Sequence, residues 1–296
     1  MNVQRLEGFY WVARAGGYAR AARAFPYPIT APGVFQQVKK LEQELGVRLF
    51  ERTGRERLVR TPAGNQLYEF VAPFMERLPA VLDLLSGKGL GGRIRVRSAS
   101  QVLRTLLPAW LARLERSNPR IQVELDDLGD NDVGMLQRGE TDVFIDAPES
   151  VPPGIEALRI GTLHAYLVLP ARHPLAKGRA PKLKELAAEP LVAYSGQGRH
   201  RALQLRALEL QGIHPTRIVG AGSADSILAL VAAGLGYSLV PAFGSGPGQP
   251  GVASWRFTEP RTDFPVFAMW RKTSAGHPLV AAFLAEAPRE KAGRRA

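Results

Sequence analysis

Residues 30–46 constrain the fold of this chain more than any other stretch. Thr30 can cap a helix, Pro32 suits a first helical turn, and Gly46 can end a helix in a left-handed conformation. Between these signals apolar residues recur at spacings of four, three and four, at Val34, Val38, Leu41 and Leu45. This period predicts an amphipathic helix with one narrow apolar stripe.

The opposite side of this predicted helix carries amide and ammonium groups. At about 100° per residue it holds Pro32, Gln36, Lys39 and Gln43, with Phe35 and Lys40 at its flanks. Amides and ammoniums can hydrogen-bond to base edges in the major groove of DNA, and lysines can neutralise phosphates. Because glutamine and lysine also cover ordinary surface helices, the neighbouring segments decide between these two interpretations.

The segments before this helix predict two more helices. Residues 4–15 place apolar side chains on one helical face, and residues 18–25 form a short alanine-rich stretch that allows close packing. Pro26 and Pro28 interrupt the helical pattern before residue 30. The order of helix, short helix, turn and helix is the plan of a helix-turn-helix unit, whose last helix reads DNA.

A basic hairpin is predicted directly after residue 46. Two short apolar segments, residues 47–50 and 58–59, flank a turn that carries Arg52, Arg55 and Arg57. Such a β-wing can lay guanidinium groups against a phosphate backbone. The net charge of +12 favours a polyanionic partner without identifying it.

Together these segments resemble the DNA-binding domain of the LysR-type transcriptional regulators. The resemblance rests on Ala21-Ala22, residues 30–42, Glu44-Leu-Gly-Val-Arg-Leu-Phe-Glu-Arg52 and Thr61-Pro-Ala-Gly64. It implies a winged helix-turn-helix that binds double-stranded promoter or operator DNA. The expected DNA-binding residues are Thr30, Ala31, Pro32, Phe35, Gln36, Lys39, Lys40, Arg52, Arg55 and Arg57.

Three departures from the family pattern bear on operator preference rather than on DNA binding. The turn at residues 26–29 is longer than the usual turn and could alter the angle of the recognition helix. Ala31 stands where the family most often has glutamine. Phe35 stands where a serine or another small polar residue is usual.

A long helix is predicted from Pro62 to about Leu85. Its apolar residues follow alternating spacings of four and three, typical of a two-helix coil, at Leu67, Val71, Phe74, Leu78, Val81 and Leu85. The alternative is a helix packed on its own domain, but LysR-type regulators dimerise through a helix at this place. Pro73 and Pro79 predict a bend, and the glycine-rich residues 87–92 predict a flexible joint.

Beyond this joint short apolar strands alternate with helical stretches. Strands are expected at residues 94–96, 121–125, 143–145, 166–169, 191–194, 218–220, 237–240 and 266–270, and helices at 103–114, 202–211 and 226–233. Such alternation predicts parallel sheets with helices on both faces. The fold class is therefore α/β overall, after an α-rich winged helix-turn-helix domain and a long linker helix.

This second region resembles the effector-binding domain of LysR-type regulators, which has the fold of periplasmic solute-binding proteins. The resemblance rests on residues 107–108, 118–119, 139–143, 173–175, 230–237 and 240–241. It implies two subdomains, the first formed by residues 93–163 and 266–288 and the second by 164–265. The expected domains are thus 1–61 for DNA binding, 62–92 for linker helix and hinge, 93–288 for the effector, and a basic tail at 289–296.

A ligand in such a fold lies at the carboxyl ends of the strands, where helix N-termini offer N–H groups. These positions match where the family places its effector contacts. The expected effector-binding residues are Ser98, Ser100, Gln101, Gly129, Asp146, Ser195, Gln197, Arg199, His200, Ser223 and Ala224. Each serine could instead be a simple helix cap. The hydroxyls beside Arg199 and His200 favour a small anionic effector, and Arg97 could either add charge to the site or fill it.

Several other functions find little support. The chain has no cysteine, which excludes disulfides, thiolate metal sites and thiol nucleophiles. Its five histidines are scattered without metal-ligand spacing, and Ser195 lacks the surroundings of a nucleophile elbow. No apolar run reaches the ~18 residues of a membrane span. We therefore expect no enzyme activity, cofactor or bound metal.

The resulting hypothesis is a cytoplasmic, sequence-specific transcriptional regulator whose activity responds to a small-molecule effector. The resemblance implies self-association as a homodimer and homotetramer, and RNA polymerase is a further candidate partner. The alternative is a small-solute-binding protein whose DNA-binding half has a non-regulatory or architectural role.

Overall fold

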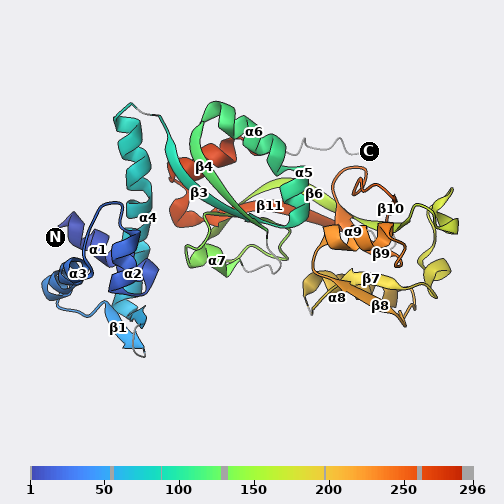
Figure 1. The fold of residues 1–296 in the computed structure, drawn as a ribbon, viewed down its shortest axis with the longest axis horizontal. Helices are drawn as coiled ribbons and strands as arrows, with labels where there is room; N and C mark the ends of the chain where they lie inside the picture. Colours follow the sequence, from blue (N-terminus) through green and yellow to red (C-terminus); the bar gives the residue numbers. More distant parts are fainter. Residues whose placement is uncertain are drawn as a thin grey trace. The chain divides into compact units, whose positions relative to one another are not determined.

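The computed structural model describes residues 2–53, 57–87, 89–127, 133–196, 198–258 and 262–288. The chain divides into two compact units, Met1–Leu90 and Gly91–Ala296 (Figure 1). Arg55, Gly129, Gln197 and the tail 289–296 lie outside the described residues, and so does the side chain of Ser100. Among the described residues, no helix is both long and apolar enough to cross a membrane.

Unit 1 is a three-helix head followed by a hairpin and a long helix. Its elements are α1 (Val3–Ala15), α2 (Tyr18–Ala24), α3 (Ala31–Leu45), β1 (Phe50–Thr53), β2 (Arg57–Arg60) and α4 (Pro62–Leu85). The predicted end signals of α3 are confirmed. The Thr30 hydroxyl accepts a hydrogen bond from the Gly33 N–H at 3.2 Å, and Gly46 has a φ of 69°.

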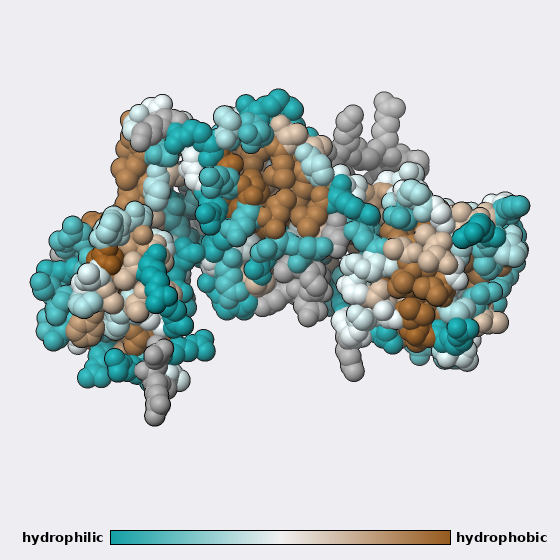
Figure 2. Space-filling model, in the orientation of Figure 1, coloured by the Kyte–Doolittle hydropathy of each residue, from teal (hydrophilic) through white to brown (hydrophobic). Residues whose placement is uncertain are grey.

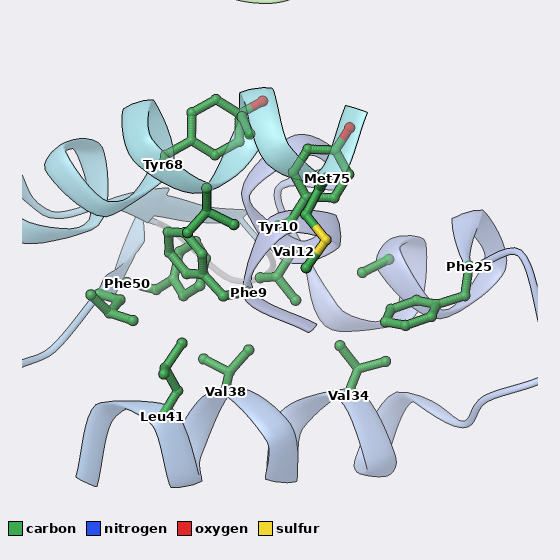
Figure 3. Close-up of a cluster of buried hydrophobic side chains, with 14 residues drawn as sticks. Phe9, Tyr10, Val12, Phe25, Val34, Val38, Leu41, Phe50, Tyr68 and Met75 are labelled. Carbon is green, nitrogen blue, oxygen red and sulfur yellow. The ribbon is translucent and has the colours of Figure 1, made fainter. Parts of the chain in front are cut away.

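The apolar stripe of α3 forms the floor of the unit 1 core. Val34, Val38 and Leu41 are fully buried and point toward Phe9 and Val12 of α1 (Figure 3). Side chains from α4 close the same core from the other side, including Tyr68, Val71 and Met75. The outer face of α3 is left exposed, because only its stripe is needed for packing.

The wing is an antiparallel hairpin tied to both neighbouring helices. Phe50 pairs with Arg60 and Thr53 with Arg57. The Glu42 carboxylate of α3 accepts the Leu49 N–H at 2.6 Å, and Thr61 caps α4 by accepting the Gly64 N–H at 3.0 Å. Gly64 is required, since a Cβ there would lie 2.1 Å from the Leu49 carbonyl oxygen.

Unit 2 contains a seven-stranded sheet, a separate strand pair, and covering helices. Its strands are β3 (Gly91–Ser98), β4 (Arg120–Asp127), β5 (Val143–Asp146), β6 (Ile155–Pro170), β7 (Leu191–Tyr194), β8 (Ile218–Ala221), β9 (Ser238–Ala242), β10 (Val252–Arg256) and β11 (Asp263–Arg271). Its helices are α5 (Ser100–Thr105), α6 (Leu107–Ser117), α7 (Gly134–Gln137), α8 (Arg199–Glu209), α9 (Ala224–Ala232) and α10 (Pro278–Ala285), with short turns η1 (Pro174–Ala176), η2 (Leu183–Leu186) and η3 (Lys272–Ser274).

The prediction of parallel sheets is wrong for most of this unit. The large sheet has the order β10-β6-β11-β5-β3-β4, and β9 also pairs with β6. Among the pairs of named strands in the described residues, β3 with β4, β3 with β5, and β7 with β8 are parallel, whereas β6 and β11 pair antiparallel with all their neighbours. The reason is that β6 is one 16-residue strand whose first half was not predicted. Its partners β9, β10 and β11 all follow it in the chain and run back along it in the opposite direction.

We call residues 91–163 and 266–288 lobe I, and residues 164–258 lobe II. Strands β6 and β11 run between the two lobes (Figure 1). The last helix, α10, completes lobe I, because the Phe283 ring stacks on Trp110 of α6 with centroids 4.3 Å apart. The Trp110 indole N–H also donates to the Phe283 carbonyl oxygen at 2.6 Å.

Candidate functional sites

The outer face of α3 gathers the side chains expected to contact DNA. Pro32, Phe35, Gln36, Lys39 and Lys40 are all exposed, while Ala31 is half-buried and Thr30 serves as the cap. They lie opposite the buried stripe because α3 is regular over its whole length. The wing adds the exposed Arg52 and Arg57 from β1 and β2.

Phe35 is held in a defined position on that face. Its ring lies edge-on against the Tyr18 ring of α2, with centroids 5.2 Å apart and an interplanar angle of 84°. The Lys39 ammonium nitrogen lies 6.0 Å from the Phe35 ring centroid. Burial raises the pKa of the Tyr18 phenol, and the negative charge of Glu42 adds to this effect. The phenol therefore stays uncharged.

The longer turn between α2 and α3 packs onto α1. The Tyr27 hydroxyl donates to the Glu7 carboxylate at 2.6 Å, and the Tyr27 ring contacts the Phe25 ring edge-on at 5.3 Å. Phe25 is buried against Trp11. The extra residues of the turn are thus held against α1 by a hydrogen bond and aromatic contacts.

The apolar residues of α4 divide between two faces. Val71 is 3% exposed and belongs to the unit 1 core, against which Leu67 also packs. These two residues therefore do not offer the free surface that a seam with a second chain requires. A separate apolar stripe faces outward; we call it the α4 stripe, and it consists of Phe70, Phe74, Leu78, Val81 and Leu85. Figure 2 shows brown, apolar surface along the upper part of α4.

A cavity of about 180 Å³ lies between the lobes of unit 2. Six of the expected effector-binding residues line it, namely Gln101, Asp146, Arg199, His200, Ser223 and Ala224. They come from the start of α5, the end of β5, and the starts of α8 and α9. The convergence of strand ends and helix starts that the sequence predicted is therefore present in the structure.

Other expected residues have structural roles outside the cavity. Ser98 is fully buried, and its hydroxyl donates to the Ile145 carbonyl oxygen at 3.1 Å. Ser195 is not among the lining residues, and its N–H donates to the Ala221 carbonyl oxygen. Arg97 does not line the cavity either, since it pairs with Asp126 at 3.1 Å and donates to the Met135 sulfur. It therefore neither fills the cavity nor adds a charge to its wall.

Burial controls the charges at the centre of the cavity. It raises the pKa of Asp146, against the opposing effects of the Ala147 N–H hydrogen bond and the nearby His200 and Arg199. Burial also lowers the pKa of His200, and the positive Arg199 adds to that effect while Asp146 opposes it. Both shifts disfavour the charged forms of the two side chains.

Polar groups from both lobes line the cavity. Gln101 is 5% exposed, and its amide nitrogen has no hydrogen-bond partner within the described part of the protein. Arg199 donates to the Ala147 carbonyl oxygen and lies 3.2 Å from the Glu149 carboxylate, which links α8 of lobe II to lobe I. A second link joins Arg104 of α5 to Asp225 of α9 at 2.8 Å.

The rest of the wall is largely apolar, and this part was not predicted. It includes Leu163, Leu203, Leu210, Phe257 and Phe264, together with the Tyr194 ring, which lies 4.9 Å from the His200 ring. Tyr194 ends the predicted strand at residues 191–194, directly before the expected site residue Ser195. Its place in the sequence could therefore have indicated that it lines the cavity. Phe257 follows β10, which was not predicted, and its role had no such signal.

The Gln204 side chain stabilises this wall through two hydrogen bonds to backbone groups. Its amide oxygen accepts the Tyr194 N–H at 2.9 Å, and its amide nitrogen donates to the Leu239 carbonyl oxygen at 2.8 Å. The side chain is 4% exposed. Among the described residues, no group of histidine, cysteine or acidic side chains could hold a metal ion.

Comparison with known proteins finds a family match for each of the two parts of the chain. Residues 3–65 match the family described as bacterial regulatory helix-turn-helix protein, lysR family, and residues 87–291 match the LysR substrate binding domain. The transcriptional regulator BenM of Acinetobacter baylyi is 25% identical over 248 residues, which cover 82% of this chain and 81% of BenM.

Two solved structures have the same architecture along nearly the whole chain. A full-length OxyR variant from Pseudomonas aeruginosa is 22% identical with a TM-score of 0.69, covering 99% of this chain and 100% of that one. Full-length CbnR complexed with its target DNA is 27% identical with a TM-score of 0.55, covering 97% and 99%.

Proposed function

This chain belongs to the LysR family of transcriptional regulators, and we propose that it controls transcription by binding promoter DNA under the control of an organic acid. Its matched families and its relatives are regulators rather than enzymes. The observation that carries the proposal is the exposed polar face of α3 beside a basic wing, in a chain that also has a lined cavity between two lobes.

The DNA-binding part of the proposal rests on charge and geometry in unit 1. Gln36 can hydrogen-bond to a base edge, while Lys39, Lys40, Arg52 and Arg57 can neutralise phosphates. All five side chains are exposed. CbnR, whose full-length structure includes its target DNA, supports the same use of this architecture.

The anionic effector is supported by three hydrogen-bond donors that line the cavity. The buried Gln101 amide nitrogen needs an acceptor, and an effector carboxylate would supply one. The Ser223 hydroxyl and the Arg199 guanidinium lie in the same wall. Asp146 also lines the cavity, and burial disfavours its charged form.

The apolar wall specifies the rest of the effector. Leu203, Phe257 and Phe264 offer no hydrogen-bond partner, so they favour an apolar or aromatic body over a sugar or a polyamine. The proposed effector is thus a small organic acid with one carboxylate and an apolar body.

Self-association completes the proposal. The α4 stripe is a largely exposed apolar strip suited to pairing with a second copy. It keeps Phe74, Leu78, Val81 and Leu85 of the seam predicted from the sequence and adds Phe70. Strand β4 lies at the edge of its sheet, and Figure 2 shows apolar surface over β4 and α6, which offers unit 2 a contact for tetramers. We propose that such assemblies act on promoter DNA in the cytoplasm and contact RNA polymerase there.

Two measurements on the full-length protein test this function. In gel shifts, the chain should bind DNA from upstream of its own gene in the presence of excess random competitor. In thermal melts, some small organic acids should stabilise it, by about 2.7 kcal/mol at one hundred times Kd. The matching amides should stabilise it less, because they lack the charge that strengthens hydrogen bonds to Arg199.

A matched pair of variants separates the cavity from general effects. Gln101→Leu should abolish the response to acids, whereas Gln137→Leu, at an exposed position of α7, should retain it. Binding to random DNA as tight as to promoter DNA would contradict the regulatory function. Stabilisation by amides equal to that by acids would contradict the anionic effector alone.

A further inference from the structure

An exposed aromatic ring on the DNA-facing side of α3 has no structural explanation within unit 1. Phe35 is 40% exposed, although every other exposed side chain between Pro32 and Gln43 on α3 is polar. The fully buried Val34 and Val38 already fill the core beneath it. Phe35 packs against Tyr18 rather than into the core, and the exposed part of its ring remains available to a partner.

The ring is also fixed in direction. Tyr18 packs edge-on against one side of it, and Lys39 lies one helical turn further along the same side of α3. A ring that is already ordered loses little conformational entropy on binding. Because Gln36, Lys39 and Lys40 surround it, the partner that fits this surface is a polyanion with an apolar group near its charged backbone.

Duplex DNA presents one such apolar group in its major groove. Each base edge there carries hydrogen-bond donors and acceptors, and thymine adds its C5-methyl group. A phenyl ring cannot hydrogen-bond to the polar edges, and covering them would remove their water without replacement. We propose that Phe35 reads the C5-methyl group of a thymine in each operator half-site, and that Tyr18 is the positioning residue for its ring.

This inference rests on the proposed DNA-binding function and goes beyond it by assigning a base. It also accounts for the departure from the family pattern at Phe35, where a serine or another small polar residue is usual. A serine there would donate or accept a hydrogen bond, whereas phenylalanine selects for a methyl group. The operator of this chain should therefore contain a thymine that a chain with serine at this position does not require.

Uracil substitution tests the contact one methyl group at a time. The full-length protein is first used to select its preferred duplex from a random pool. Each thymine of that duplex is then replaced by uracil, which keeps the base pair and removes only the methyl group. At one thymine per half-site the affinity should fall about fourfold, the equivalent of ~0.8 kcal/mol for one buried carbon.

Variants assign that loss to the ring. Phe35→Ser should still bind the duplex but should no longer distinguish thymine from uracil at that position. Tyr18→Ala should reduce the distinction, and Tyr18→Phe should restore it, because only the ring is needed to hold Phe35. Tyr27→Ser alters an exposed aromatic residue of the turn and should leave the distinction unchanged.

The outcomes separate this inference from the proposed function. Failure of the protein to select any sequence would overturn the function itself. Selection of a sequence in which no thymine is sensitive to uracil would overturn only the role of Phe35. The same conclusion would follow if Phe35→Ser kept the wild-type sensitivity, or if Phe35→Ser changed self-association instead of base preference.

Discussion

Replacing Phe70 by serine should separate the two copies of a dimer without unfolding either. The Phe70 side chain is 81% exposed on the α4 stripe. A fully buried aromatic side chain covers roughly 200 Å², so about 160 Å² of Phe70 is available to a partner. At ~25 cal/mol per Å², its complete burial would contribute at most about 4 kcal/mol per copy.

Only part of that value will be realised, because association also orders side chains at the contact. If a quarter of this burial free energy contributes to association in each copy, the substitution weakens the association free energy of the dimer by about 2 kcal/mol in total. The dissociation constant then rises roughly thirtyfold. The assay is analytical ultracentrifugation of residues 1–90, which form a compact unit with their own core.

Phe35→Ser in the same fragment is the matched control, since Phe35 is an exposed phenylalanine on α3 rather than on α4. Thermal melts of the three fragments establish that each is folded. The reasoning fails if the wild-type fragment is a monomer at high concentration. It also fails if both variants have the same dissociation constant.

Three further predictions concern the DNA surface and the cavity. Gln36→Ala should lose roughly 1–3 kcal/mol of discrimination between operator and random DNA, whereas Arg57→Ala should weaken binding to both and flatten the salt dependence in filter-binding titrations. Gln204→Leu should lower the free energy of unfolding by about 2–4 kcal/mol in denaturant titrations, because two backbone groups lose a buried hydrogen bond, and Gln137→Leu should not. Burial raises the folded-state pKa of Asp146, so the wild type loses stability as the pH rises above the unfolded value of 3.8. The Asn side chain cannot ionise, so the difference in melting temperature between Asp146→Asn and the wild type should shift in favour of the variant from pH about 4 to about 7. A difference that stays constant over this range would contradict the raised pKa.

Local signals predicted unit 1 closely. The cap at Thr30, the stop at Gly46 and the start of α4 at Pro62 depend on nearest neighbours in the chain, and the structure has all three. The role of Val71 was not predictable in this way. A spacing of four and three describes an apolar face but does not say whether that face meets the same domain or a second chain.

Unit 2 was less predictable because its sheet depends on distant pairings. The first half of β6 and the whole of β10 carry mixed polar and apolar residues, and their partners lie elsewhere in the chain. The cavity's polar end was predictable from strand ends, as with Asp146 and Ser223. Its apolar side includes Phe257, which follows β10, and Phe264, which pairs with Leu163 of β6. Neither β10 nor this part of β6 was predicted as a strand, so the sequence did not indicate this side.

The course of β11 has a consequence for how the chain folds during synthesis. β11 pairs with β5 and β6, and α10 packs on α6, although the whole of lobe II lies between these segments in the sequence. Lobe II is thus an insertion that can fold as soon as it is made, whereas lobe I must wait for β11 and α10 to emerge. Contacts that close such long loops form slowly, so an unfinished lobe I exposes apolar strands while the ribosome completes the chain.

Truncation from the C-terminal side should therefore harm the first-made lobe more than the later-made one. A stop codon placed after residue 258 would leave lobe II with all its own strands but would deprive Trp110 of its stacking partner. Lobe II, by contrast, begins and ends on neighbouring strands. That geometry makes it the portion of the chain most easily exchanged for the corresponding portion of a relative.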